Sequence, residues 1–180
     1  MNILILTGSP RPDGNTDLLV NAFAKGATQN NDVEIVNVRD YNVHPCVGCN
    51  LCFSNESHAC HQQDDMSIIY GKLSQTDMLV IASPLYFYGL SAQLKTVIDR
   101  LHNPIRNTFH IKKMALLLVA AGSIPTQFDS IISQYQHCLN YFKMEDAGKI
   151  LVNHVNDRGS IAGNAALSEA ERLGASLQTL

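Results

Sequence analysis

The chain has 180 residues, of which 46% are hydrophobic and 16% charged, and its formal net charge at pH 7 is −3. Its length matches one ordinary globular domain, so we expect residues 1–180 to form a single domain with one sizeable core. The small net charge, without a cluster of Lys and Arg, argues against nucleic acid or an anionic membrane as a partner.

No segment has the pattern of an export signal or of a membrane span. The first apolar run, residues 3–6, has no basic residue before it and stops at Thr7. The longest apolar run, residues 114–121, falls far short of the ~18 residues that a membrane span needs. The sequence therefore predicts a cytoplasmic protein.

Five apolar runs rich in Ile, Val and Leu are typical of strands that are buried on both faces. These predicted strands are residues 2–7, 33–38, 78–82, 114–120 and 149–155. Apolar residues at helical spacing predict helices over residues 16–28, 65–74, 91–101, 126–142 and 163–177. Strand and helix alternate five times, which predicts an α/β fold, a doubly wound parallel sheet with helices on both faces.

The loop between the first strand and the first helix carries groups that suit a phosphate. Ser9 and Thr16 supply hydroxyls, Asn15 an amide and Arg11 a cation, and the helix start adds unpaired N–H groups. The loop is neither a Walker A motif nor the dinucleotide pattern G-x-G-x-x-G. A plain turn capped by Asn15 or Thr16 is the alternative. We favour phosphate binding because all these groups meet at one helix start.

The loop after the third strand holds three consecutive aromatic residues. It reads Ser83-Pro84-Leu85-Tyr86-Phe87-Tyr88-Gly89. Neighbouring side chains of a loop point in different directions, so three in a row are poorly placed to enter one core. Aromatic rings at a pocket rim can instead stack on a planar ligand. The alternative, that Tyr86 or Phe87 packs beneath the loop, is expected for one of the three.

Two sequence blocks together resemble the NAD(P)H-dependent FMN reductase family of flavodoxin-like proteins. The first is Gly-Ser-Pro-Arg-x-x-Gly-Asn-Thr at residues 8–16, and the second is residues 83–89 followed by Gln-Leu-Lys-x-x-x-Asp-Arg at residues 93–100. The resemblance covers nearly the whole chain. It implies a flavodoxin-like sheet of strand order 2-1-3-4-5 and a homodimer with the flavin near the interface.

The same resemblance implies which residues contact FMN. The phosphate is expected in the first loop, and the ring beside the second loop and the glycine after the fourth strand. The implied cofactor residues are Ser9, Arg11, Asn15, Thr16, Ser83, Pro84, Leu85, Tyr86, Phe87, Tyr88 and Gly122. The polar residues that follow, Gln93, Lys95, Asp99 and Arg100, are expected to be solvated helix residues that form local ion pairs.

Four of the five cysteines form the pattern Cys46-x2-Cys49-x2-Cys52-x7-Cys60. Thiolates at this spacing can converge on a [4Fe–4S] cluster, and the segment resembles the compact cysteine motif of iron–sulfur flavoproteins, which are flavodoxin-like relatives. Two alternatives stay open. The cysteines are free thiols or a local disulfide, as in family members without a cluster, or they bind zinc with His58 or His61 replacing one thiolate. The fifth cysteine, Cys138, is expected to be a buried small hydrophobic residue.

The sequence as a whole predicts an FMN-dependent oxidoreductase. Hydride passes from NAD(P)H to flavin when the two rings stack, so the protein contributes binding, orientation and redox tuning, and no catalytic acid or base is assigned. The expected acceptor is a quinone, a nitro- or azo-aromatic compound or free flavin. One alternative is an electron carrier of the flavodoxin or iron–sulfur type. Another is a redox or metal sensor without FMN, in which the cysteines are the active part.

Overall fold

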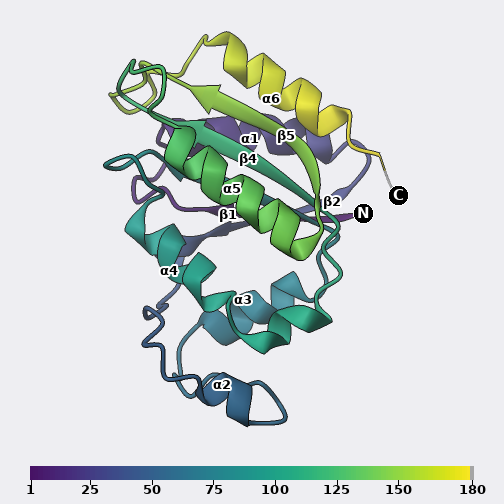
Figure 1. Cartoon of the computed structure of the whole chain (residues 1–180). Coiled ribbons are helices and arrows are strands. Elements are labelled where there is room, and N and C mark those ends of the chain that lie inside the picture. The colour runs from purple at the N-terminus through teal and green to yellow at the C-terminus, as the bar shows by residue number, and fades with distance from the viewer. Residues whose placement is uncertain (179–180) are drawn as a thin grey trace.

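The computed structural model describes residues 1–178 and contains a five-stranded sheet between two layers of helices (Figure 1). All neighbouring strands are parallel, and their order is β2-β1-β3-β4-β5. The strands are β1 (Asn2–Thr7), β2 (Asp32–Asn37), β3 (Met78–Pro84), β4 (Lys113–Val119) and β5 (Glu145–Val152). The expected flavodoxin-like doubly wound sheet and its strand order are confirmed.

Helices cover both faces of this sheet. One face packs against α1 and α6, and the other against α3, α4 and α5. The long helices are α1 (Asn15–Ala27), α3 (Met66–Leu73), α4 (Ala92–Arg100), α5 (Asp129–Phe142) and α6 (Ala165–Ala175). Three short elements, which the sequence did not predict, are η1 (Val38–Asp40), α2 (Leu51–Ser54) and η2 (Pro104–Thr108).

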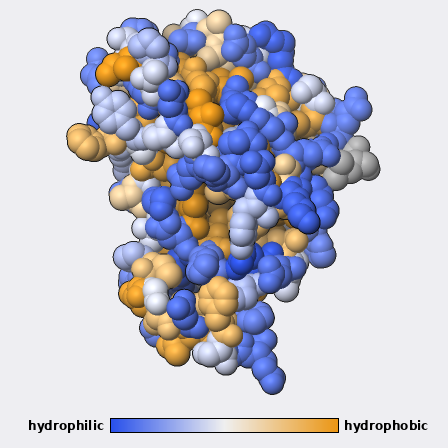
Figure 2. Space-filling view, viewed as in Figure 1, coloured by the Kyte–Doolittle hydropathy of each residue, from blue (hydrophilic) through white to orange (hydrophobic). Residues whose placement is uncertain are grey.

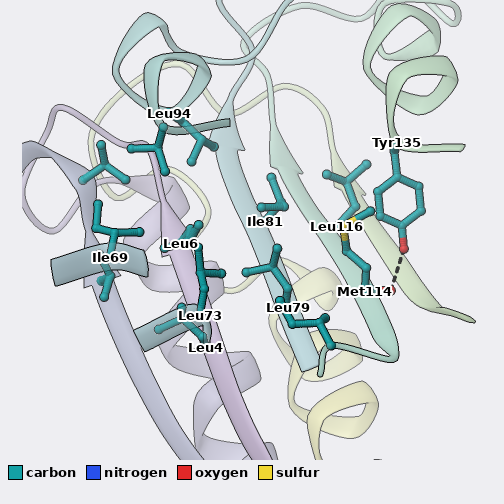
Figure 3. Packing of buried hydrophobic residues seen from close by; sticks show 14 of the residues in the cluster. Leu4, Leu6, Ile69, Leu73, Leu79, Ile81, Leu94, Met114, Leu116 and Tyr135 are labelled. Carbon is teal, nitrogen blue, oxygen red and sulfur yellow. Dashed lines mark hydrogen bonds between the residues drawn. The ribbon is translucent and has the colours of Figure 1, made fainter. Parts of the chain in front are cut away.

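Side chains along β1 point alternately to the two faces of the sheet, and both faces are buried. The strand therefore appears in the sequence as a continuous apolar run. Leu4 and Leu6 point toward α3, α4 and α5, whereas Ile3 and Ile5 point toward α1 and α6. Figure 3 shows the first of these two cores, with Tyr135 of α5 lying over β4. The Tyr135 hydroxyl donates a 2.6 Å hydrogen bond to the Met114 carbonyl. Burial raises the pKa of Tyr135, so the hydroxyl stays protonated and remains a donor.

The position of β5 differs from the expectation. The apolar pattern predicted a strand at residues 149–155, but β5 spans Glu145–Val152. It lies at the edge of the sheet, so its first residues, Glu145 and Asp146, are exposed and break the apolar pattern. A register shift opposite Met114 and Ala115 adds a local irregularity near Gly148, whose φ is +126°.

The topology places a switch point at the carboxyl ends of β1 and β3. The chain leaves β1 toward β2 on one side and later resumes with β3 on the other, so the loops after β1 and β3 diverge beyond their carboxyl ends. Ligands of doubly wound sheets bind at such a switch point. Within the described residues, no helix has the length and apolar character needed to cross a lipid bilayer.

Candidate functional site

The loop after β1, which we call the phosphate loop (residues 8–16), folds tightly against the start of α1. The Ser9 hydroxyl accepts a hydrogen bond from the Arg11 N–H (3.3 Å) and donates one to the Arg11 carbonyl (3.0 Å). α1 begins after Gly14, and no side-chain hydrogen bond caps it. Its first N–H groups and the positive end of its dipole are therefore left for an anion.

The phosphate loop also touches the start of α4. The Gly8 N–H donates to the Ala82 carbonyl of β3 at 2.9 Å. A Cβ on Gly8 would lie 2.4 Å from the Ser91 hydroxyl oxygen and 2.5 Å from the Leu94 Cβ. Ser91 is the N-cap of α4, so only a glycine lets the first loop approach the segment that follows β3 this closely. The two sequence blocks thus meet in space.

The polar residues predicted for the phosphate have different surroundings. Arg11 is exposed, and no carboxylate pairs with it among residues 1–178. Thr16 is buried in the first turn of α1. The Asn15 amide donates to the carbonyls of Val155 (3.1 Å) and Asp157 (2.9 Å). The Asn15 side chain therefore ties the phosphate loop to the chain after β5, which leaves its backbone N–H for a phosphate.

Ser83, near the end of β3, hydrogen-bonds to residues on both sides of the loop that follows this strand. The Ser83 hydroxyl accepts from the Ser91 N–H (3.0 Å) and donates to the Pro84 carbonyl (2.8 Å). The Leu85 N–H donates to the Val119 carbonyl (2.8 Å), and the Leu85 side chain packs against the core. These bonds fix both ends of the segment that carries the aromatic residues.

The aromatic turn, residues 86–89, projects from this loop. Tyr86 and Gly89 exchange two backbone hydrogen bonds of 3.0 Å, and Phe87 and Tyr88 between them have φ values of +47° and +64°. Left-handed backbone costs an L-residue about 1–2 kcal/mol, and such strain concentrates at ligand sites. Tyr86, Phe87 and Tyr88 are 42%, 99% and 51% exposed. The expectation that one of them packs beneath the loop is wrong, because Leu85 fills that place.

Gly122 lies in the neighbouring loop, after β4. Its carbonyl accepts hydrogen bonds from the Gln127 side-chain amide (3.1 Å) and from the His154 N–H (3.3 Å). The same Gln127 amide donates to the Asn153 side chain at 2.5 Å. The loop after β4 is thereby joined to the loop after β5, at the same edge of the sheet as the aromatic turn.

The cysteine segment, residues 46–60, extends away from the sheet and includes the short α2 (Figure 1). Cys46 and Cys49 are exposed, and Cys52 and Cys60 are half-buried. The Cys49 sulfur lies 3.4 Å from Nδ1 of His61. Burial raises the pKa of Cys52, and repulsion from the thiolates of the other three cysteines raises it further. The four thiols are therefore close enough to influence one another.

The cysteine side chains are not arranged as a set of metal ligands in the described residues. In the part of the chain that the structure describes, no three His, Cys, Asp or Glu side chains are arranged to hold a metal ion. All five cysteines are free thiols in this structure. The predicted ligands, Cys46, Cys49, Cys52 and Cys60, share one short segment but have not converged. Cys138 is half-buried in α5, where burial raises its pKa, close to the expected small hydrophobic role.

A buried ion pair anchors both ends of the cysteine segment to α4. Arg100 donates to Asp64 through Nη1 (2.7 Å) and Nη2 (3.3 Å), and Nη1 also donates to the His44 carbonyl (2.9 Å). The His44 N–H donates to Asp64 at 2.8 Å. The side chains of Arg100 and Asp64 are 3% and 1% exposed. We call this set, Asp64, Arg100 and the His44 backbone, the clasp.

The clasp sets the charge of Asp64. Burial alone would raise the pKa of this carboxyl, but the hydrogen bonds from Arg100, His44 and Met66 outweigh burial and hold the pKa below its usual value. Asp64 therefore stays ionised at neutral pH and keeps Arg100 paired. The expectation that Arg100 is a solvated residue in a local pair is wrong, whereas Lys95 and Asp99 do form the expected exposed pair.

Comparison with known proteins agrees with this geometry. A family model described as NADPH-dependent FMN reductase matches residues 1–157. The chain belongs to this family. Over 124 residues it is 38% identical to an iron–sulfur flavoprotein of Methanocaldococcus jannaschii, a match that covers 68% of this chain and 63% of that protein. It spans 46% of an iron–sulfur flavoprotein of Archaeoglobus fulgidus at 32% identity. The chain thus spans less than two thirds of these relatives.

A solved structure shows the same fold over the full length. The NAD(P)H:quinone oxidoreductase from Methanothermobacter marburgensis superimposes with a TM-score of 0.79 and 16% identity, covering 100% of this chain and 97% of that one. An FMN-dependent NADH-azoreductase from Bacillus anthracis, solved with FMN, gives a TM-score of 0.69 at 15% identity, covering 99% and 100%. At this identity the two structures establish the fold of this FMN reductase family member.

One ion pair at the phosphate loop was not predicted from the sequence. Asp17, in the first turn of α1, and Arg39, in η1 after β2, form an ion pair with Nη2 and Oδ2 3.0 Å apart. Arg39 also donates to the Ser9 carbonyl at 2.9 Å. The expected strand order was the available signal, because it places the end of β2 beside the loop after β1.

Proposed function

We propose that the protein is an FMN-dependent oxidoreductase, a single domain that passes electrons from NAD(P)H to a small acceptor. The observation that carries this proposal is the uncapped start of α1 beside a strained, exposed aromatic turn at the switch point of the sheet. Bound FMN would supply the redox chemistry, by accepting hydride from the nicotinamide and returning electrons to an acceptor.

The residues present fit FMN. The first N–H groups of α1 would hold the phosphate, together with Arg11, the hydroxyls of Ser9 and Thr16 and the backbone N–H of Asn15. The segment from Ser83 to Tyr88 and the loop at Gly122 would border the ring. Because the aromatic turn is open to solvent, a planar nicotinamide or acceptor can approach without opening the core.

Anaerobic purification followed by visible spectroscopy tests this function. We expect flavin bands that bleach quickly when NADH or NADPH is added and that return with a quinone or an azo compound. Flavin that only dithionite or a protein partner reduces would favour the electron carrier instead. Colourless protein that takes up no added FMN would contradict FMN binding altogether.

A variant pair localises the phosphate. Removing the cation and the hydroxyl of the phosphate loop with Ser9→Ala and Arg11→Ala should weaken FMN binding at least about tenfold, since hydrogen bonds to charged groups contribute about 1.5–3 kcal/mol. The matched control is Ser168→Ala with Arg172→Ala in α6, an exposed serine and arginine outside the phosphate loop. Unchanged affinity in the first variant would place the phosphate elsewhere.

The second candidate is an electron carrier with a [4Fe–4S] cluster on Cys46, Cys49, Cys52 and Cys60. Two observations favour it: relatives that are named iron–sulfur flavoproteins, and four free thiols in a segment anchored at both ends. Such thiolates would supply the four ligands of a cluster. Anaerobic reconstitution followed by iron and sulfide analysis tests this. Stoichiometric zinc or metal-free thiols after reconstitution would contradict it.

We also propose a homodimer. A cavity of about 540 Å³ lies between α4 and α5 over β3 and β4, lined mainly by apolar side chains such as Ile98, Phe109 and Leu116. Figure 2 shows apolar surface along the middle of this face, between polar flanks. A second copy would cover this apolar surface and the nearby aromatic turn. A monomeric mass at working concentration, measured by light scattering, would contradict the dimer.

A further inference from the structure

An acidic residue stands where an anion is expected to bind. Asp17 occupies the first turn of α1, directly after Thr16, and its carboxylate accepts a hydrogen bond from the Asp13 N–H (3.0 Å) in the phosphate loop. Its side chain is only 11% exposed, so water screens its charge weakly. An unpaired carboxylate at this position would repel a phosphate bound at the start of the helix.

Arg39 reaches this carboxylate from η1, which follows the neighbouring strand β2. Its guanidinium contacts both Asp17 oxygens, Nη2 to Oδ2 at 3.0 Å and Nη1 to Oδ1 at 3.3 Å. Nη1 also donates to the Ser9 carbonyl at 2.9 Å, and the Arg39 side chain is 19% exposed. A bidentate contact of this kind is the geometry in which arginine binds a carboxylate most strongly. The Arg39 side chain therefore forms an ion pair with Asp17 and also a hydrogen bond to the Ser9 carbonyl.

We propose that Arg39 is a positioning residue that makes the phosphate loop receptive to a phosphate. It offsets the negative charge of Asp17 and orients the backbone at Ser9, while Asp17 in turn holds the Asp13 N–H in place. The proposal rests on the proposed FMN binding. It assigns Arg39 to recognition of the phosphate and not of the ring, so it predicts an effect on FMN that riboflavin does not share.

The test compares the affinities for FMN and riboflavin, followed by quenching of flavin fluorescence. Arg39→Met should weaken FMN binding at least about tenfold, because it leaves a carboxylate unpaired beside the phosphate. Riboflavin, which has no phosphate, should change much less. Adding Asp17→Asn should restore most of the FMN affinity, since asparagine keeps an acceptor for the Asp13 N–H but carries no charge.

Asp40→Asn is the matched control. Asp40 also faces Arg39, with Oδ1 3.9 Å from Nε, but it is 63% exposed and lies outside the phosphate loop. Its removal should leave both affinities unchanged. Thermal unfolding shows which variants are folded, and Asp17→Asn alone, which keeps one oxygen to accept from the Asp13 N–H, should bind FMN as tightly as the wild type or more tightly.

Three results would overturn the proposal. One is an equal loss of FMN and riboflavin affinity in Arg39→Met, which would mean that Arg39 only maintains the fold. Another is a double variant that binds FMN no better than Arg39→Met. The third is a selective loss of FMN affinity in Asp17→Asn. Wild-type protein that binds neither flavin would instead contradict the proposed function, so the two failures are distinguishable.

Discussion

The phosphate loop and the cysteine segment both belong to connections that leave the carboxyl ends of adjacent strands, β1 and β2, but they are held in different ways. The phosphate loop is fixed from within, by Ser9, by the Asp17–Arg39 pair and by contact with α4 at Gly8. The cysteine segment is joined to the rest of the molecule mainly at its ends, where the clasp links residues 44 and 64 to α4. Its interior is largely exposed and is held by local hydrogen bonds around Asn55.

This difference fits the two kinds of ligand proposed for these segments. A loop that is rigid before the ligand arrives loses little conformational entropy on binding, which suits a phosphate held by backbone N–H groups. A largely exposed segment, anchored to the rest of the molecule mainly at its ends, can still rearrange, which would suit thiols that must converge on a metal, because ligands rarely stand preformed without one. Four experiments test this contrast.

The largest effect is expected from Arg100→Met, which breaks the clasp. Removing one partner of a buried ion pair leaves the other charge uncompensated and costs about 3–5 kcal/mol of unfolding free energy. Urea denaturation measures the loss. The control is Lys95→Met, which breaks the exposed Lys95–Asp99 pair in the same helix and should cost less than about 1 kcal/mol. Equal losses in both variants would show that the clasp does not anchor the segment.

The next effect is expected from Gly8→Ala in the phosphate loop. The added Cβ collides with Ser91 and Leu94, so α4 must shift, and overpacking of this kind costs about 1–3 kcal/mol. FMN affinity should fall as well, because the two loops at the switch point move apart. Gly71→Ala in α3 meets no atom within 4 Å and should instead stabilise the protein by about 0.5–1 kcal/mol. A Gly8→Ala protein of unchanged stability would contradict the close approach.

A matched insertion compares the two segments directly. Two residues, Gly-Ser, inserted between the exposed Val47 and Gly48 lengthen the cysteine segment and should cost no more than about 0.6 kcal/mol. The same insertion between Pro12 and Asp13 separates the Gly14 N–H from the Arg11 carbonyl, to which it donates at 3.3 Å, and it should cost more and abolish FMN binding. Thermal unfolding and a flavin titration measure both. Similar losses would mean that the cysteine segment is also fixed from within.

The smallest effect concerns the thiols of the metal-free, reduced protein. The raised pKa of Cys52 keeps more of it in the thiol form, and only the thiolate is alkylated. Cys52 should therefore react more slowly with iodoacetamide than the exposed Cys46 near neutral pH. The gap should narrow as the pH rises through the Cys52 pKa, where the stabilisation that favours the thiol is lost. Mass-spectrometric mapping follows each site, and equal rates at neutral pH would contradict the raised pKa.

Much of the architecture could be predicted because it depends on local pattern. Strands buried on both faces give continuous apolar runs, and β1, β3 and β4 appeared at or near their true bounds. β5 was misplaced because its exposed edge lets polar residues begin the strand. The short α2 has only four residues and three of them are exposed, so it is too short for a helical period to mark it in the sequence.

The sequence alone shows which chemical groups the three segments carry. These are hydroxyls, an amide and a cation at a helix start, three aromatic residues after a proline, and four closely spaced thiols. The tertiary structure decided what each of these is free to do. The Asn15 amide binds the turn after β5, and Arg100 is buried against Asp64. Arg39, in η1 after the neighbouring strand β2, pairs with Asp17. These pairings join residues far apart in the chain, so only the packing of the sheet and its helices brings the partners within hydrogen-bonding distance.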